Sequence, residues 1–225
     1  MNAPWGKLFY RLLWHNLECE GKRILDFGSG FGVTADHFAR KNEVVAVEPN
    51  TEMLKNRFQM NDYRQIVGGF KQLCELPADS FEVIFCHNVM EYIENRVELL
   101  SEFKRILKPD GYVSLVKHNK SGKIMHKAVF DYNVDTAMDL LKNGQAVSEN
   151  FGIIREYELS DLKLYCRGLF HVSRIYGIRT FFGLQNNEYK NDSEWTEKMY
   201  GLERAVESIP DFRNVAFFHH IILEI

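Results

Sequence analysis

Residues 23–50, RILDFGSGFGVTADHFARKNEVVAVEPN, contain the pattern on which the interpretation of the whole chain depends. The apolar residues Ile24, Leu25 and Phe27 are typical of a short strand buried on both faces. Three glycines at a spacing of two follow it: Gly28, Gly30 and Gly32. Glycine tolerates the backbone angles of a tight turn and lets a ligand approach where a Cβ would clash. The stretch therefore predicts a strand that ends in a ligand-binding turn.

The second half of the stretch completes a strand–helix–strand unit. A helix is predicted over Val33–Arg40, with its N-terminal amides directed at whatever occupies the crevice beside the turn. A second buried strand over Val44–Val47 ends at Glu48. A carboxylate at that position can accept hydrogen bonds from both hydroxyls of a ribose. The unit predicts a site for a cofactor that contains a nucleoside.

The spacing of the glycines distinguishes between two cofactors. A dinucleotide site has the pattern G-x-G-x-x-G, which would require a glycine at Val33, whereas the third glycine here is Gly32. Asp26 stands two residues before the first glycine, where its carboxylate would repel a pyrophosphate but suit a cationic amino-acid group. S-adenosyl-L-methionine (SAM) has such a group and no phosphate. The pattern favours SAM over NAD.

This run resembles the first motif of the class I SAM-dependent methyltransferases, and Glu48 matches their acidic residue at the end of the second strand. The resemblance implies SAM as cofactor, with S-adenosyl-L-homocysteine as its product. In the family pattern a residue near Met53 touches the adenine, and packing in the core explains Met53 equally well. Gln72 stands where many relatives have an acidic residue that accepts from the adenine amino group. The predicted cofactor-binding residues are Asp26, Gly28, Ser29, Gly30, Gly32, Glu48, Pro49, Met53, Phe70, Lys71, Gln72, His87 and Asn88.

Composition sets the broad class of protein. A chain of 225 residues with 45% hydrophobic content can bury one good core, so a single domain over 1–225 is expected. The net charge of −3 gives no overall basic signal for nucleic acid, although a local patch is compatible with it. The four cysteines have no C-x-x-C spacing, which indicates a reduced, cytoplasmic protein without a structural metal. No apolar run reaches the 18 residues or so of a membrane span.

Strands and helices alternate through the rest of the chain. This order predicts an α/β fold, a doubly wound Rossmann-like sheet of seven strands with the last strand antiparallel. A helix is expected from Thr51, its N-cap, to Met60, followed by a loop over Gly68–Gln72. Lys108–Gly111 has the composition of a turn before the fifth strand. A helical insertion, at about 119–145, follows that strand.

The variable regions resemble one branch of the family, the bacterial tRNA methyltransferases that esterify 5-carboxymethoxyuridine at the wobble position. The resemblance rests on Gly6–Leu17, His87–Tyr92, Leu115–Tyr132, Tyr176–Arg179 and the terminal strand. That branch has an arginine, a tyrosine and a histidine in its last strand, where they would hold a carboxylate. Here the histidine is His220, but Phe217 stands at the arginine position. Either another residue, such as Arg179 or Lys117, supplies the charge, or the acceptor is a different molecule.

Three histidines are the candidate catalytic residues: His118, His126 and His220. We expect them to surround the acceptor, and one of them to take a proton if that acceptor is a hydroxyl. The predicted reaction is methyl transfer from SAM to an oxygen, with a modified wobble uridine of tRNA as one acceptor. The alternatives are a small-molecule methyltransferase and a SAM-binding protein without catalysis. A tRNA enzyme needs a basic rim, for which the candidates are Lys117, Lys120, Lys123 and Lys127.

Overall fold

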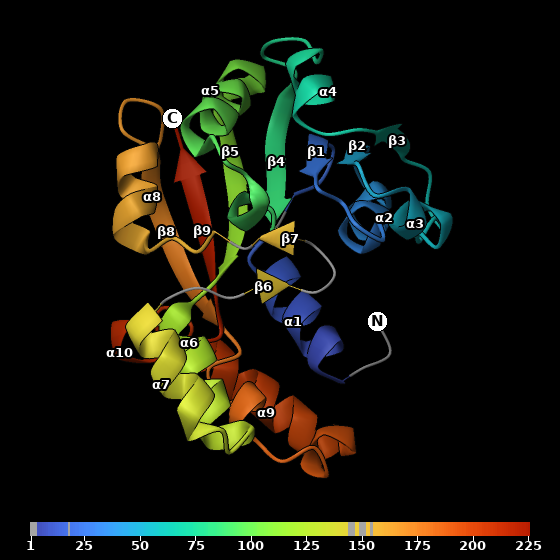
Figure 1. Cartoon of the computed structure of the whole chain (residues 1–225). Helices are drawn as coiled ribbons and strands as arrows, with labels where there is room; N and C mark the ends of the chain where they lie inside the picture. Colours follow the sequence, from blue (N-terminus) through green and yellow to red (C-terminus); the bar gives the residue numbers. More distant parts are fainter. Residues whose placement is uncertain (1–3, 18, 144–146, 149–151, 154) are drawn as a thin grey trace. The chain divides into compact units, whose positions relative to one another are not determined.

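The computed structural model of the chain describes residues 4–17, 19–143, 147–148, 152–153 and 155–225. A seven-stranded mixed sheet runs through it in the order β3-β2-β1-β4-β5-β9-β8, with the last strand, β9, antiparallel (Figure 1). This arrangement confirms the predicted α/β sheet. The strands are β1 Arg23–Phe27, β2 Glu43–Glu48, β3 Arg64–Val67, β4 Phe81–His87, β5 Leu107–His118, β8 His171–Ile178 and β9 Phe218–Glu224.

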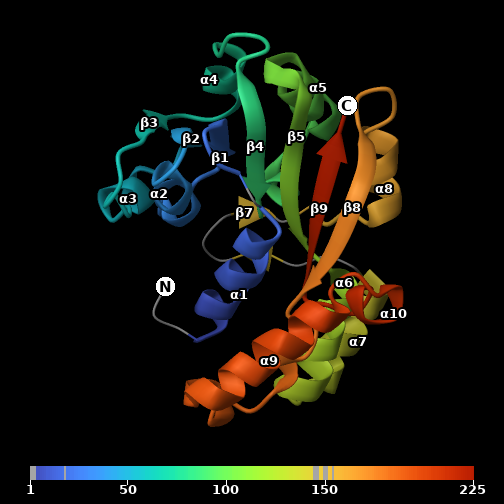
Figure 2. The ribbon, with the colours of Figure 1, turned by 180° about the vertical axis from the view of Figure 1, so that it is seen from behind.

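Helices flank the sheet and fill the connections between its strands (Figure 2). Within the described residues, none of them combines the length and apolar character needed to cross a membrane. The helices are α1 Pro4–His15, α2 Val33–Ala39, α3 Thr51–Lys55, α4 Phe70–Cys74, α5 Arg96–Ile106, α6 Lys120–Met125, α7 Val134–Asn143, α8 Leu159–Tyr165, α9 Ser193–Val206 and α10 Pro210–Arg213. The structure also has the 3₁₀ helices η1 Met90–Tyr92, η3 Phe182–Leu184 and η4 Tyr189–Asn191 and the π-helix η2 His126–Phe130. The strands β6 Val147–Ser148 and β7 Gly152–Ile153 form an antiparallel pair.

The central strands are parallel and buried on both faces, as their continuous apolar sequence predicts. Strand β1 pairs with β2, where Asp26 lies opposite Ala46, and with β4, where Asp26 lies opposite Phe85. Parallel pairing aligns the carboxyl ends of these strands along one edge of the sheet. That edge holds the glycine turn after β1, Glu48 at the end of β2 and His87 at the end of β4.

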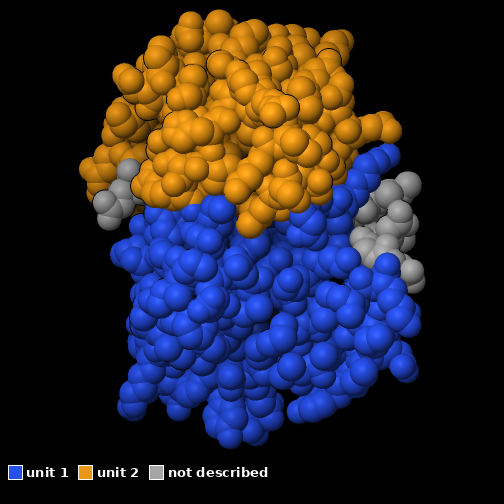
Figure 3. All heavy atoms as spheres, turned by 90° about the vertical axis from the view of Figure 1, so that its left-hand side faces the viewer, with its two compact units in different colours: residues 1–18, 117–158, 175–220 blue, residues 19–116, 159–174, 221–225 orange. Residues whose placement is uncertain are grey.

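The chain forms two compact units, which have separate colours in Figure 3. Unit 1 consists of residues 1–18, 117–158 and 175–220, and unit 2 of residues 19–116, 159–174 and 221–225. Strands β5, β8 and β9 each contribute residues to both units. The helices that follow β5, from Lys120 to Asn143, confirm the predicted helical insertion and belong to unit 1. The assignment of residues 1–225 to a single domain stays a prediction.

The predicted helix after Glu48 is shorter than expected and begins differently. Its N-cap is Asn50, not Thr51, because the Asn50 Oδ1 accepts from the backbone N–H groups of Glu52 and Met53 at 3.0 and 3.2 Å. Helix α3 ends at Lys55 instead of Met60. The Met60 N–H is used elsewhere, since it donates to the Asp36 carboxylate at 2.6 Å.

Two further local predictions were wrong. The segment expected to be a loop after β3 contains the start of α4, at Phe70. The segment 108–111, expected to be a turn before the fifth strand, lies within β5. Leu107 pairs with Phe81 and Tyr112 pairs with Val83, so the extra residues of β5 are accommodated as a bulge. Turn-forming residues here interrupt a strand without ending it.

Candidate functional site

The glycine turn adopts the conformation that its sequence predicts. Gly28, Gly30 and Gly32 have φ angles of +77°, +56° and +71°, a region that residues with a side chain rarely adopt. A Cβ at Gly28 would lie 2.2 Å from Val89, and one at Gly32 would lie 2.2 Å from the Tyr63 hydroxyl. Both backbone angle and space therefore require glycine at these two positions.

Glu48 braces the turn from the end of β2. Its Oε2 accepts from the Gly30 backbone N–H and its Oε1 from the Asn50 N–H, both at 2.8 Å. The residue is buried, with 6% of its surface exposed. An ionised carboxylate has roughly four acceptor positions, so two remain after these backbone contacts. Glu48 can therefore hold the turn and still accept from two hydroxyl groups of a ligand.

Three buried oxygens around the turn accept no hydrogen bond from any described residue: Asp26 Oδ2, Ser29 Oγ and Asn88 Oδ1. They come from the ends of β1 and β4, which are neighbours in the sheet. Buried polar atoms normally have partners, so such a set indicates a ligand that donates hydrogen bonds. The ammonium and hydroxyl groups of SAM are such donors, and the residues present therefore fit that cofactor.

Asp26 has the most perturbed environment in this group. Burial raises the pKa of Asp26 to about 7, and the nearby Glu48 charge raises it further, whereas a hydrogen bond from the Ala35 backbone opposes the shift. A positive ligand group beside Asp26 would favour its ionised form. Binding of a cation beside Asp26 would therefore lower its pKa and stabilise the carboxylate.

His87 and Asn88 occupy the end of β4. The His87 Nε2 lies 2.9 Å from the Ser114 hydroxyl, and its ring stacks on Phe85 at 5.2 Å. Burial lowers the pKa of His87 to about 3, so its ring is neutral at physiological pH. Asn88 has a φ of +57° and donates its N–H to the Val116 carbonyl at 2.8 Å. This φ lies in the left-handed region, which is uncommon for a residue with a side chain and indicates local backbone strain.

The remaining predicted cofactor residues lie on α3 and α4, except for Pro49, which precedes α3. Met53 approaches the turn, because its Cε lies 3.2 Å from the Cβ position of Gly30. Pro49 is exposed directly after Glu48. Gln72 caps its own helix, since its Oε1 accepts from the Gly69 N–H at 2.9 Å. Phe70 and Lys71 lie in the same first turn of α4.

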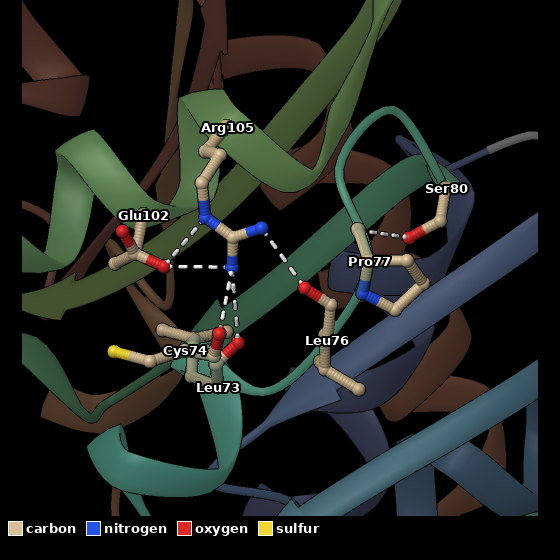
Figure 4. A network of polar contacts seen from close by, with 7 residues as sticks. All are labelled: Leu73, Cys74, Leu76, Pro77, Ser80, Glu102 and Arg105. Carbon is tan, nitrogen blue, oxygen red and sulfur yellow. Dashed lines mark hydrogen bonds and ion pairs between the residues drawn. The ribbon is translucent and has the colours of Figure 1, made fainter.

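Arg105 of α5 anchors the opposite end of α4 (Figure 4). Its guanidinium donates to the carbonyls of Cys74 at 3.3 Å and Leu76 at 2.9 Å, and its Nε donates to Glu102 at 2.8 Å. These bonds satisfy carbonyls that a helix C-terminus leaves without partners. Arg105 thereby fixes the helix whose first turn holds Phe70, Lys71 and Gln72. Sequence reasoning did not identify this arginine, because its acceptors lie about thirty residues away.

The three candidate catalytic histidines all belong to unit 1. His118 and His126 pack edge-on against the ring of Phe217, with centroids 5.9 and 5.3 Å away. His220 is fully buried and its ring lies 5.6 Å from that of Tyr176. The structure therefore brings His118 and His126 to one phenylalanine and places His220 beside a tyrosine.

The four lysines proposed as a basic rim have different surroundings. Lys117 is buried and donates to the His118 carbonyl at 2.6 Å. Lys123 pairs with Glu156 at 2.6 Å, and Lys127 pairs with Asp131 at 2.7 Å. Lys120 Nζ lies 3.4 Å from the Leu141 carbonyl. A buried lysine and two neutralised ones form a weak basic surface for a polyanion.

Comparison with known proteins agrees with the fold and the turn. The family described as "Methyltransferase domain" matches residues 25–115. A ubiquinone biosynthesis O-methyltransferase of Paracidovorax citrulli is 28% identical over 120 residues, which are 49% of this chain and 49% of that protein. An uncharacterized methyltransferase of Schizosaccharomyces pombe is 29% identical over 139 residues, 55% of this chain and 48% of that protein. The chain spans about half the length of these curated relatives.

Solved structures share the whole architecture at low identity. A SAM-dependent methyltransferase from Mesorhizobium loti has a TM-score of 0.63 and 16% identity, and covers 98% of this chain and 99% of its own. One from Archaeoglobus fulgidus has a TM-score of 0.63 and 15% identity, with 98% and 94% covered. The fold is that of the class I SAM-dependent methyltransferases. Within it, residues 25–115 are similar to the methyltransferase-domain family, and the methyl donor of the class I enzymes is SAM.

Proposed function

We propose that the chain transfers a methyl group from SAM to an oxygen atom of its acceptor. The observation that supports this most directly is the set of buried acceptors at the glycine turn, above all Asp26, whose Oδ2 is bonded to none of the described residues. A cationic ligand with hydroxyl groups complements that set. The similarity of residues 25–115 to methyltransferase domains supports the same assignment.

The chain's residues have separate roles in this proposal. SAM, when bound, supplies an activated methyl group. Asp26 receives the ammonium group, Glu48 receives the ribose hydroxyls, and the first turn of α4 approaches the adenine. The protein then has to align the acceptor oxygen with the methyl group and to remove its proton if it has one.

His126 is the proposed base. Its Nδ1 lies 3.6 Å from the Asp131 carboxylate, which orients the ring and leaves Nε2 for the acceptor. Burial lowers the pKa of His126, an effect that Asp131 opposes and that nearby Arg179 adds to. The ring is therefore neutral near pH 7 and able to take a proton. His118 and His220 are proposed to position the acceptor.

The test measures binding and turnover separately. Calorimetry with SAM should show binding that the Asp26→Asn variant loses and that the exposed control Asp62→Asn retains. Transfer of labelled methyl from SAM should fall in His126→Ala with SAM affinity unchanged. Full turnover in the single variants of His118, His126 and His220 would remove these histidines from the mechanism. SAM binding with no transfer to any acceptor tried would favour the non-catalytic alternative.

The acceptor is the finer part of the proposal. The resemblance to the wobble-uridine enzymes favours a modified uridine of tRNA, whereas the neutralised lysines favour a small molecule. The O-methyltransferases among the relatives support an oxygen acceptor in either case. Mass spectrometry of tRNA nucleosides from a deletion strain distinguishes the two. An unchanged nucleoside profile would exclude the tRNA acceptor and leave the small-molecule one.

A further inference from the structure

Two buried cations in unit 1 form no ion pair with a carboxylate among the residues that the structure describes. Arg179 and Lys190 are 9% and 8% exposed. Neither forms an ion pair with a described residue, and the Arg179 Nε is buried without a hydrogen bond to any of them. Among the described residues, Lys190 donates one hydrogen bond, of 3.1 Å, to the Asn187 side-chain oxygen. Burying unpaired charge is costly, so the two cations indicate a site that binds an anion.

The acidic residue that interacts with Arg179 does not fill this role. Glu203 interacts electrostatically with Arg179. Its carboxylate, however, accepts three consecutive backbone N–H groups, those of residues 180–182, each at 2.8 Å. The Arg179 φ of +63° places it at the start of this turn. Glu203 therefore stabilises the turn that presents the arginine and leaves the guanidinium without an ion pair.

The cations converge with His126 at one place. A Cβ added at Gly183 would lie 3.4 Å from the Arg179 Nη2 and 3.6 Å from the His126 Cδ2. Burial lowers the pKa of Lys190, and the charge of Arg179 lowers it further, which shows that the two cations interact. Arg179 and Lys190 both also lower the pKa of His126. Arg179 and His126 thus both lie beside Gly183, and the Lys190 ammonium lies 5.3 Å from the ring of the neighbouring residue, Phe182.

Aromatic rings surround these groups. The Arg179 guanidinium carbon lies 4.9 Å from the centre of the Phe217 ring and 5.5 Å from that of Trp5. The Lys190 ammonium lies 4.3 Å from the Phe130 ring. Rings partly compensate a desolvated cation, yet they give no hydrogen-bond acceptor for the guanidinium. Aromatic rings beside cationic groups are complementary to a ligand in which a planar ring bears an anionic group.

We propose that Arg179, Lys190 and His126 form a binding site for an oxyanion carried on a flat ring. The guanidinium and the ammonium bind the oxyanion, and the Phe217 and Phe130 rings contact the planar body. That this ligand is the methyl acceptor rests on the proposed function, whereas the anion site does not.

The test uses the full chain with three probes, benzoate, its neutral counterpart benzamide, and inorganic phosphate, by calorimetry and thermal shift. Benzoate should bind and raise the unfolding temperature, and benzamide should do neither. Phosphate binding as tight as benzoate binding would assign the site to phosphate esters; weaker phosphate binding would assign it to carboxylates.

Variants connect the binding to these residues. Arg179→Gln and Lys190→Met should each weaken benzoate binding at least about tenfold, the effect of one charge-assisted hydrogen bond. Gly183→Ala keeps both charges but places a methyl group between Arg179 and His126, and should weaken it too. Lys198→Gln removes an exposed charge that pairs with Glu194, and should change nothing. Circular dichroism checks that each variant is folded.

Two results would overturn the anion site: equal binding of benzoate and benzamide, or no binding of benzoate and phosphate by wild-type protein that binds SAM. SAM binding, measured on the same samples, depends on residues of unit 2. If the wild-type protein does not bind SAM, the proposed function is contradicted, and the benzoate result alone decides whether the anion site exists.

Discussion

The two units differ in the sign of the groups that lack a partner among the described residues. In unit 2, buried oxygens at the glycine turn, including Asp26 Oδ2, accept no hydrogen bond from a described residue. In unit 1, the buried cations Arg179 and Lys190 form no ion pair with a described residue, and the Arg179 Nε has no hydrogen bond to one. A buried charged or polar group without a partner favours the binding of a ligand group of complementary charge. The first set fits a cationic cofactor, and the second fits an anion.

The largest effect is expected from Asp26→Asn. Removing one charge of a desolvated pair costs about 3–5 kcal/mol, so SAM affinity should fall by a factor of about a hundred or more. Calorimetry measures it, with Asp62→Asn as the exposed control. Benzoate binding should be unchanged, because its proposed ligands lie in unit 1. A joint loss of both affinities would break the division of roles between the units.

Glu203→Gln should lower the free energy of unfolding. The carboxylate accepts three backbone N–H groups, and an amide would turn a donor toward them, at a cost of about 2–3 kcal/mol. The unfolding temperature should then drop by roughly 4–12 °C for a chain of this size. Glu197→Gln on the same helix removes only an exposed ion pair with Arg11 and should shift it by about 1–2 °C or less. Equal shifts would argue against a buried anchoring role.

Glu48→Gln should weaken SAM binding by roughly ten- to thirtyfold, which corresponds to about 1.4–2 kcal/mol. The amide keeps one acceptor oxygen but directs N–H groups at either the Gly30 or the Asn50 amide. A competition assay with adenosine distinguishes its role: adenosine has the ribose but no ammonium group. Adenosine affinity should fall in Glu48→Gln and stay the same in Asp26→Asn.

The smallest effect is a pH dependence of SAM binding. With a pKa of about 7 in the free protein, Asp26 is mainly protonated at pH 6 and mainly ionised at pH 8. Because the cation binds the ionised form, affinity should rise about tenfold between these two values. The Asp26→Asn variant should lose that rise. A rise that persists in the variant would assign it to another group.

The difference between the units also explains what sequence could predict. The turn, Asp26 and Glu48 lie within one strand–helix–strand unit, where spacing fixes geometry. Arg105 could not be identified in this way, because its carbonyl partners lie on a helix about thirty residues away. Arg179, Lys190 and His126 converge only through the tertiary fold, and no local pattern connects them. Lys117 was expected at a surface, but it is buried.

Local errors had local physical causes. Thr51 and Asn50 are both good N-caps, and only the structure shows which side chain accepts from the backbone. The segment 108–111 has the composition of a turn, yet a bulge accommodates it within β5. Composition at such positions indicates a departure from regular backbone without deciding whether the strand ends there.

Without a bound cation, the buried Asp26 carboxyl group also affects the lifetime of the protein. Its pKa is 3.8 in an exposed state and about 7 when folded, so between these values the folded form holds the extra proton. Stability contributed by that proton is present below about pH 4 and is lost as the pH rises through 7. At cellular pH the ligand-free protein is therefore destabilised, and a bound cation restores it by mass action. The abundance of this chain should follow the supply of its methyl donor, because ligand-free molecules unfold and are degraded first.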